Sequence, residues 1–166
     1  MTAGFWDWSV AIYRQGDVEK TTIQLQDDFD LNVNVVLWCC WCAHHYEEIP
    51  EFALRKAIEE TSNWTNKVTG PIRSARRASK EQSAIENDLY NTLKNAELMA
   101  EQVEQTSLAL IAENQLKPAQ RDIPLSCARR NLSRYIALLG TVRQPGFSIE
   151  LIETLLAAIF DNQQTN

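Results

Sequence analysis

Four cationic side chains lie within eight residues of each other, at Arg73, Arg76, Arg77 and Lys80. At three- and four-residue spacing they fall on one face of a helix. The chain carries a formal net charge of −6, so this face would be a local positive patch on an acidic protein. Guanidinium groups bind carboxylate and phosphate groups through paired hydrogen bonds, which predicts a binding face for an anionic partner or ligand. The plainer interpretation is a solvated face whose cations pair with acidic neighbours such as Glu81.

One amide and two indole side chains, Asn34, Trp38 and Trp41, recur at near-helical spacing. If their helix lies beside Arg73 and Arg77, the five residues could bound a pocket for an anionic or amphipathic ligand. The plainer interpretation of the two tryptophans is a stripe of core residues. Asn34 is the exception, because a buried amide without hydrogen bonds costs about 1–3 kcal/mol. We expect it to tie down the end of a neighbouring helix.

Three thiols and two imidazoles, the side chains that bind zinc most often, crowd one segment at Cys39, Cys40, Cys42, His44 and His45. Structural zinc sites usually take ligands from two elements, and the rest of the chain adds only Cys127. We therefore interpret the cysteines as small apolar residues of a buried helix, with the histidines at its wetter end. We expect neither a metal nor a cofactor.

Neither acidic cluster of the sequence has the spacing of a known catalytic centre. Asp27, Asp28 and Asp30 lie too close together for a magnesium-diphosphate motif, which needs carboxylates one turn apart on facing helices. The second cluster, Glu97, Glu101 and Glu104, lacks the Glu-x-x-His spacing of a di-iron site and is expected to be a solvated face. The two histidines are adjacent, so no catalytic residue is assigned and an enzyme is disfavoured.

Length and composition indicate one soluble domain. The chain has 166 residues, of which 45% are hydrophobic, enough for a core without disulfides. We expect a single domain over residues 1–160 and a frayed tail over 161–166. The acidic charge disfavours general nucleic-acid binding and anionic membranes.

Hydrophobicity and cysteine usage predict the compartment. No secretory signal is recognisable at the N-terminus. The longest apolar run, Val33 to Ala43, is shorter than the ~20 residues that span a bilayer. Unpaired cysteines are typical of a reducing compartment, so a cytoplasmic location is expected.

Apolar residues recur at three- and four-residue spacing with only five Gly and five Pro in the chain, which predicts an all-α fold. We expect an irregular bundle of seven or eight helices around a buried central helix at about residues 31–46, with Asp30 as its N-cap. The helices before and after it are expected at about 6–14, from Asp17, and from Pro50 to near Ser62. The residues expected to face inward in the first and last of these helices are Trp6, Val10, Tyr13, Phe52, Leu54, Ala57 and Ile58, and the helix from Asp17 carries Val18, Ile23, Leu25 and Phe29.

In the second half of the chain the main predicted element is one long helix at about residues 82–114. Gly70-Pro71 is expected to break or kink the helix before it. The stripe predicted to face inward on the long helix consists of Ile85, Leu89, Leu93, Ala96, Ala100, Val103 and Leu110. Such a helix needs a partner along its length, either in the same chain or in a second copy. Two shorter helices should follow, one from Pro124 to Gly140 and one from Ser148.

Several of these segments together resemble a family of short, uncharacterised proteobacterial proteins with helical folds. The residues that carry the resemblance are Phe5-Trp6-Asp7-Trp8-Ser9 with Tyr13, Leu25-Gln26, Asp30 through Trp41, and Pro71-Ile72-Arg73 with Arg76-Arg77. It covers about the first eighty residues, and Asn131, Leu132, Tyr135, Leu139 and Gly140 are also similar to the family pattern. The resemblance implies no activity, substrate or cofactor.

Two functions follow from these patterns. The first is a non-enzymatic intracellular interaction module that docks an acidic protein partner through the face from Arg73 to Lys80. The alternative is a binding protein for a small anionic or amphipathic ligand, held between the helix of Asn34, Trp38 and Trp41 and the guanidinium groups of Arg73 and Arg77. A basic face over a cavity would favour the ligand, and a basic face over flat surface would favour the partner.

Overall fold

The computed structural model describes residues 4–81 and 88–161, which contain eight α-helices and no β-strand. The helices are α1 (Phe5–Tyr13), α2 (Val18–Phe29), α3 (Val33–His45), α4 (Glu51–Trp64), α5 (Gly70–Glu81), α6 (Asp88–Gln115), α7 (Pro124–Leu139) and α8 (Ile149–Phe160). A π-helical segment, Thr65–Thr69, joins α4 to α5, and a 3₁₀ helix, Thr141–Arg143, follows α7. The all-α prediction is confirmed. Residues 82–87 and 162–166, to which the predicted start of the long helix, Ile85 and most of the predicted tail belong, lie outside the described part.

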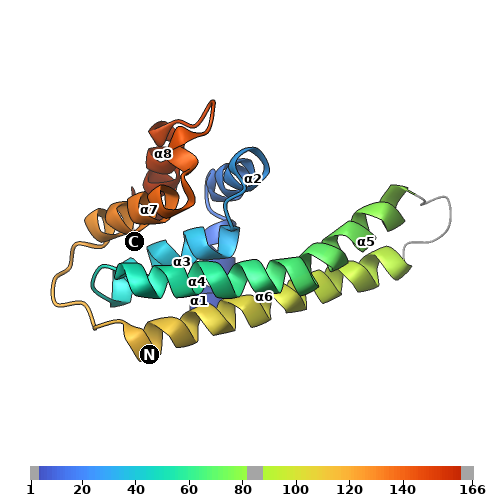
Figure 1. The fold of residues 1–166 in the computed structure, drawn as a ribbon, viewed down its shortest axis with the longest axis horizontal. Coiled ribbons are helices and arrows are strands. Elements are labelled where there is room, and N and C mark those ends of the chain that lie inside the picture. Colours follow the sequence, from blue (N-terminus) through green and yellow to red (C-terminus); the bar gives the residue numbers. More distant parts are fainter. Residues whose placement is uncertain (1–3, 82–87, 162–166) are drawn as a thin grey trace.

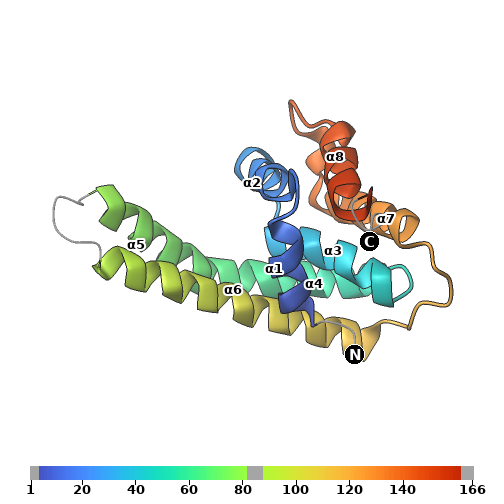
Figure 2. The ribbon, with the colours of Figure 1, turned by 180° about the vertical axis from the view of Figure 1, so that it is seen from behind.

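The helices α4 and α5 form one long rod that runs antiparallel to α6 (Figures 1 and 2). Helix α3 lies between this pair and the helices α7 and α8, while α1 packs on α3 and α6. The far half of α5 and the start of α6 project beyond the rest of the molecule (Figure 1). One side of the α5 and α6 pair therefore faces α1 and α2.

Helix α3 is the centre of the core, as predicted. Its residues from Asn34 to Ala43 are all buried, and it contacts α1, α2, α4, α6 and α7. Its N-cap is Asn32, whose Oδ1 accepts a hydrogen bond from the backbone N–H of Val35 at 3.1 Å. The prediction of Asp30 as N-cap is wrong, because Asp30 ends α2 with a φ of 58°, a left-handed conformation that aspartate tolerates better than most residues.

A fully buried amide on α7 fixes the chain where it leaves α3. Asn131 Oδ1 accepts from the backbone N–H of Ile49 at 2.9 Å, and its Nδ2 donates to the carbonyl oxygen of Cys39 at 3.0 Å. The backbone N–H of Glu47 also donates to the carbonyl of Lys117 at 2.9 Å. These contacts set the direction in which α4 starts.

Helix α4 ends at Trp64, two residues after the predicted end near Ser62, and Gly70-Pro71 opens α5 without breaking the rod, so of the predicted break or kink the break does not occur. Proline lacks an N–H and its ring crowds the preceding turn, and the π-helical segment just before it supplies a wider turn. The N–H of Gly70 donates to the carbonyl oxygen of Thr65, five residues earlier. A Cβ on Gly70 would lie 2.7 Å from that oxygen, so this turn requires glycine.

Several of the predicted inward faces are rotated. The buried face of α1 consists of Phe5, Ser9 and Ile12, one residue away from the predicted face of Trp6, Val10 and Tyr13. In the other two helices, Phe52 and Ile23 are exposed. The shift in α1 has a physical reason, because its face is centred on Ser9, a polar residue that hydrophobic periodicity counts as outward.

The largest rotation is in α6. Leu89, Val103 and Leu110, predicted to face inward, are exposed. The side packed against the body carries Glu104 and Gln105, each 4% exposed. The buried side of α6 therefore mixes these polar residues with Ala100, Leu108, Ile111 and Ala112, and differs from the apolar stripe that the sequence predicts.

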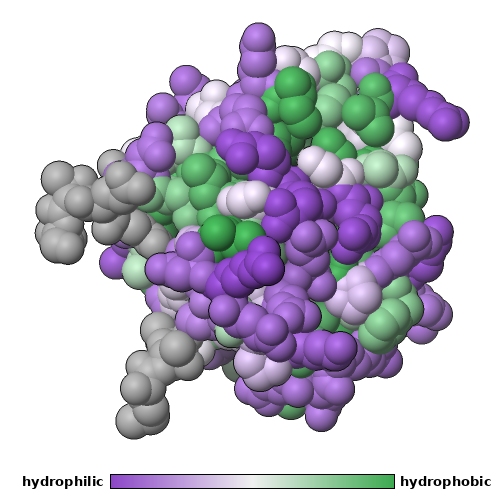
Figure 3. Space-filling view, turned by 90° about the vertical axis from the view of Figure 1, so that its left-hand side faces the viewer, coloured by the Kyte–Doolittle hydropathy of each residue, from purple (hydrophilic) through white to green (hydrophobic). Residues whose placement is uncertain are grey.

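No helix in residues 4–81 and 88–161 combines the length and the hydropathy that a membrane span needs. Figure 3 shows the end of the molecule opposite the projecting pair, where hydrophobic and hydrophilic residues alternate in small patches. The apolar run of α3 is the core helix that the sequence predicts.

Candidate functional site

A half-open cleft of about 770 Å³ lies where α1, the start of α3 and the rod of α4 and α5 face α6. The end of α2 and two residues of α7 complete its wall. The polar side chains that line it include Ser9, Asn32, Asn34, Thr69, Arg73, Arg76, Arg77, Glu97, Glu101, Glu104 and Gln105. The predicted basic face therefore opens onto a cleft, and the acidic residues of α6 form the opposite wall.

Two of the four predicted cations are paired across the cleft. Arg73 Nε donates to Glu97 Oε1 at 2.7 Å and its Nη2 contacts Glu101 Oε1 at 3.4 Å. Arg76 Nε donates to the other oxygen of Glu97, and its guanidinium lies 5.9 Å from the ring centroid of Tyr90. Burial opposes the ionisation of Glu97, but the hydrogen bonds from Arg76 and Arg73 outweigh it and hold its pKa below the ordinary value.

The other two cations are exposed. Arg77 lines the cleft, makes no ion pair with a described residue and leaves its guanidinium available. Lys80 lies one turn further along α5 and is not part of the lining. The side chain of Glu81, expected as an ion-pair partner, lies outside the described residues.

A chain of side-chain hydrogen bonds crosses the floor of the cleft. Ser9 Oγ donates to Gln105 Oε1 at 2.9 Å, and Gln105 Nε2 donates to Asn34 Oδ1 at 2.9 Å. Asn34 Nδ2 in turn donates to Glu104 Oε2 at 2.5 Å, and Asn32 Nδ2 donates to Glu104 Oε1 at 2.9 Å. Asn34 thus binds the middle of α6, and the expectation that it ties down a helix end is wrong.

In two carboxyl groups of the cleft, Glu101 and Glu104, the neighbouring donors and cations do not offset the cost of burying a negative charge. The prediction that Glu97, Glu101 and Glu104 form a solvated face is wrong, since Glu97 is 8% and Glu104 4% exposed. Burial raises the pKa of Glu104 despite the hydrogen bonds from Asn34 and Asn32. Burial also raises the pKa of Glu101, where the attraction of Arg73 is too weak to offset it. Both groups retain capacity to accept further hydrogen bonds.

One buried hydroxyl in the lining has no hydrogen-bond partner among the described residues. Thr69 is 2% exposed, and its Oγ1 makes no hydrogen bond among the described residues. Buried hydroxyls almost always have a hydrogen-bond partner.

The two predicted indoles lie elsewhere. Trp38 is 0% and Trp41 6% exposed, and neither belongs to the lining of the cleft. Trp41 packs on Phe5 with ring centroids 5.3 Å apart. Both side chains serve the core, which agrees with the plainer interpretation of their spacing.

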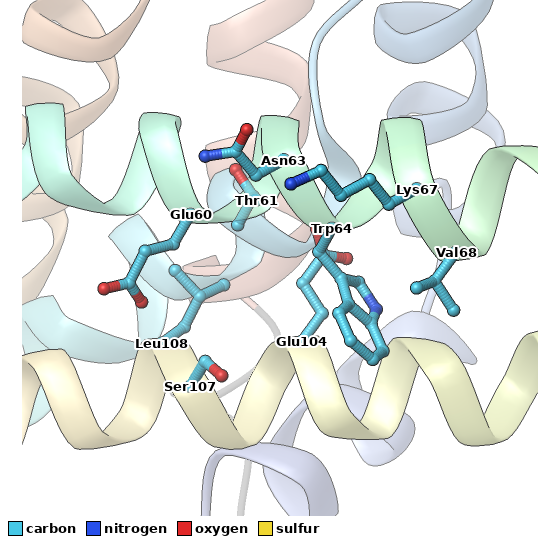
Figure 4. A pocket seen from close by; sticks show the side chains of 9 residues that line it. All are labelled: Glu60, Thr61, Asn63, Trp64, Lys67, Val68, Glu104, Ser107 and Leu108. Carbon is cyan, nitrogen blue, oxygen red and sulfur yellow. The ribbon is translucent and has the colours of Figure 1, made fainter.

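A second, smaller cavity of about 360 Å³, which no sequence pattern indicated, lies between α6 and the opposite side of the rod. Trp64 reaches between the helices there (Figure 4), and its Nε1 donates to the carbonyl of Ala100 at 2.9 Å. Val68 and Leu108 add apolar surface. Glu104 lines both cavities, so its carboxylate stands in the wall that separates them.

The cysteines behave as the plainer interpretation predicts. All four are free and buried, and burial raises the pKa of the Cys40 thiol well above its ordinary range. His44 and His45 are partly exposed at the end of α3, and burial lowers the pKa of His44. Within residues 4–81 and 88–161 no three His, Cys, Asp or Glu side chains are grouped so as to hold a metal ion.

Sequence patterns did not indicate Ser9, Asn32, Thr69 or Gln105, nor the inward role of Glu104. One signal could have found part of the site: Glu97, Glu101 and Glu104 follow one stripe of α6, as Arg73, Arg76 and Arg77 follow one stripe of α5. Opposite charges on two such stripes are typical of neighbouring antiparallel helices. Nothing comparable marks Ser9 or Gln105.

The fold and the cleft define an all-α protein with a polar cleft lined by charged side chains of both signs. The chain matches a family described as "Protein of unknown function (DUF2390)" over residues 4–108, and it belongs to that family. All of the residues that line the cleft, apart from Tyr135 and Leu139, fall within that match. No curated protein and no solved structure matches the chain significantly.

Proposed function

We propose that this protein is a non-enzymatic binding protein that holds a small anionic ligand in the cleft. The observation that carries the proposal is the guanidinium of Arg77, which lines the cleft without an ion pair to any described residue. Arg76 stands one residue before it and uses its Nε on Glu97. A guanidinium has five N–H donors, so the terminal nitrogens of Arg76 and Arg77 offer a fork for a carboxylate or phosphate.

The remaining wall suits the polar part of such a ligand. Thr69 Oγ1 is unsatisfied, and Glu101 makes only one long contact, at 3.4 Å to Arg73. Ligand pockets generally combine a few fixed polar groups with apolar surface, which Leu37 and Ile58 supply here. The groups of the floor are already held in place by their hydrogen bonds, so binding would cost little ordering.

A second candidate is the docking of an acidic protein partner on α5. Arg77 and Lys80 are both exposed on that helix, and they favour this reading. One observation weighs against it: Arg73 and Arg76 are already paired with carboxylates of α6, so half of the predicted patch is neutralised. As part of either proposal we place the protein in the cytoplasm, because its four cysteines are free, and we assign it to a proteobacterium on the resemblance of its sequence alone.

Two matched variants distinguish these functions. Arg77→Gln and Lys80→Gln each remove one positive charge from an exposed position of α5, but only Arg77 lines the cleft. Native mass spectrometry of protein from its own cells identifies a copurified ligand, and calorimetry with inorganic phosphate, citrate and that ligand measures affinity. We expect Arg77→Gln to raise the dissociation constant at least about tenfold, equivalent to about 1.4 kcal/mol, and Lys80→Gln to change it less than about twofold.

The two functions predict different outcomes for these variants. Equal losses from both variants in a pull-down, with no small molecule bound, would support partner docking on α5. The absence of a copurified molecule, together with no binding of any anion to the wild type, would overturn the ligand proposal.

A further inference from the structure

An exposed apolar seam runs along α6 on the side away from the cleft. Leu89, Ala96, Val103 and Leu110 follow each other at seven-residue spacing, and Met99 lies beside them. The exposed fractions are 62% for Leu89, 67% for Met99, 48% for Val103 and 51% for Leu110, while Ala96 is half-buried. Large apolar side chains this exposed, gathered on one helix face, are unusual on a monomer surface.

Between positions 89 and 110, the face of α6 that carries the seam is uncharged. The exposed residues beside it are Thr92, Asn95, Gln102 and Thr106. Three of the four charged residues between positions 89 and 110 line the cleft on the other side of α6, and the fourth, Lys94, also lies off the seam. In a chain that is 23% charged, a helix face some three heptads long without a charge indicates a covered surface.

We infer that a second copy of this chain packs antiparallel on this seam of α6. A seven-residue apolar repeat is the pattern by which two helices pack side by side over a long distance. Two molecules that each carry a net charge of −6 repel each other, so an uncharged contact face suits an identical partner. A basic partner would instead be expected to meet an acidic face, which this seam does not offer.

The spacing is self-complementary in the antiparallel direction. With the two-fold axis between Met99 and Ala100, Leu89 lies opposite Leu110 of the second copy, and Ala96 lies opposite its Val103. The residue numbers of the two pairs have the same sum, so both pairs fit a single two-fold axis. At the ends of the contact leucine then packs on leucine, and nearer the centre alanine packs on valine. The antiparallel direction also opposes the two helix dipoles favourably.

The position of α6 leaves room for this contact. Figures 1 and 2 show α6 along one edge of the molecule from either side. From Leu89 to Leu110 the seam is about 32 Å long at ~1.5 Å per residue. A contact of this length lies at the small end of specific interfaces, so we expect a dissociation constant of roughly micromolar order. Leu98, on the opposite side of α6, lines the cleft, so the dimer leaves the cleft open and does not depend on the proposed ligand.

Sedimentation equilibrium of the full chain over a range of concentrations tests the dimer. We expect the double variant Met99→Lys, Val103→Lys to raise the dissociation constant at least about tenfold, because it places like charges opposite each other at the two-fold axis. Phe52→Lys is the matched control, since Phe52 is 63% exposed on α4, away from the seam, and should change the constant less than about twofold. A circular dichroism melt checks that the variants fold. A wild type that stays monomeric up to about 100 μM, or a dimer indifferent to the double variant, would overturn the inference.

Cysteine cross-linking tests the direction. The four native cysteines are buried, so introduced thiols at exposed positions report selectively. Under mild oxidation, a mixture of the Leu89→Cys and Leu110→Cys proteins should give the mixed disulfide dimer, and neither protein alone should cross-link readily. Efficient cross-linking of Leu89→Cys with itself would show a parallel pair and overturn the antiparallel arrangement.

Discussion

Asn34 interrupts the most apolar helix of the chain, and its amide sets the rotation of α6 against α3. It accepts from Gln105 and donates to Glu104, so both functional ends of the amide are used. In an apolar contact many rotations of two helices bury similar area, whereas a buried amide is satisfied in few of them. This residue therefore orients the acidic wall of the cleft toward the arginines.

Replacement of Asn34 by Ala is expected to lower the free energy of unfolding by about 1–3 kcal/mol, because Gln105 loses an acceptor and Glu104 loses a donor in a buried place. Urea titration followed by circular dichroism measures the change. Asn66→Ala is the control: Asn66 also lines the cleft but is exposed, so its change should stay within about 0.5 kcal/mol. Similar small losses from both variants would contradict the structural role assigned to the amide.

Glu101 makes a testable contribution to the pH dependence of stability. It faces Arg73, Glu97 and Glu104, and burial is the main reason why its pKa is raised from 4.5. The folded protein therefore holds more protons than the unfolded chain above pH 4.5, and the stability due to this group, present at lower pH, is lost as pH rises through the raised pKa. The ionised carboxylate is thus a cost of folding at neutral pH.

Glu101→Gln should remove that loss. When the pH rises from 4.5 to 7.5, the free energy of unfolding should fall less in the variant than in the wild type. If other groups make the free energy of unfolding rise over this range, it should rise more in the variant. The difference between the two proteins isolates Glu101, and Glu113→Gln, an exposed position of the same helix, should leave the slope unchanged. Parallel pH profiles of the wild type and Glu101→Gln would contradict the assignment.

At the scale of elements, the π-helical segment decides the geometry of the cleft. It lets α4 run into α5 through Pro71, so that Arg73, Arg76 and Arg77 stay beside α6. A break at this point would have turned α5 away and dispersed the basic wall. The extra residue in the turn is accommodated because Gly70 has no Cβ to meet the carbonyl of Thr65.

Gly70→Ala is expected to destabilise the protein by about 1–3 kcal/mol, since the added Cβ is forced against backbone. The sign is diagnostic, because a glycine within an ordinary helix gains up to about 1 kcal/mol when it is replaced by alanine. Thermal and urea unfolding measure it. A stabilised Gly70→Ala protein would mean that the rod has no wide turn at this place.

The elements show which features a sequence can reveal. The central helix was predicted because it is apolar around nearly its whole circumference. The bounds of α7 and α8 were predicted from Pro124, Gly140 and Ser148, because helix starts and caps depend only on neighbouring residues. The inward faces of α1 and α6 did not follow, because Ser9, Glu104 and Gln105 are buried through partners that lie far away in the chain. Hydrophobic periodicity treats every polar residue as outward, and a polar core seam reverses that rule. Asn34, Arg73 and Arg77, which the sequence suggested as bounds of one pocket, all line the cleft, but its acidic wall and the rest of its floor were missed for the same reason.

At the scale of the whole molecule, the boundary of the family match and the boundary of the core do not coincide. The match ends at residue 108, but α7 and α8 contribute fully buried side chains, among them Leu132 and Leu155. Helix α3 packs on α7, and Asn131 holds both Cys39 and Ile49. The first six helices would therefore expose the centre of the core if they stood alone.

This argument predicts that a chain ending at Leu116, which keeps α1 to α6, does not fold cooperatively. Removal of α7 uncovers one side of α3 and removes Asn131, the hydrogen-bond partner of Cys39 and Ile49. We expect this loss to exceed the usual free energy of unfolding of about 5–15 kcal/mol. A chain ending at Asp161 is the control and should unfold with the same midpoint as the full chain, since it keeps every helix from α1 to α8. Near-ultraviolet circular dichroism during heating makes the comparison, with the five tryptophans as probes. A single sharp transition of the shorter chain would show that the first six helices form a domain of their own, and that the prediction of one domain over residues 1–160 is wrong.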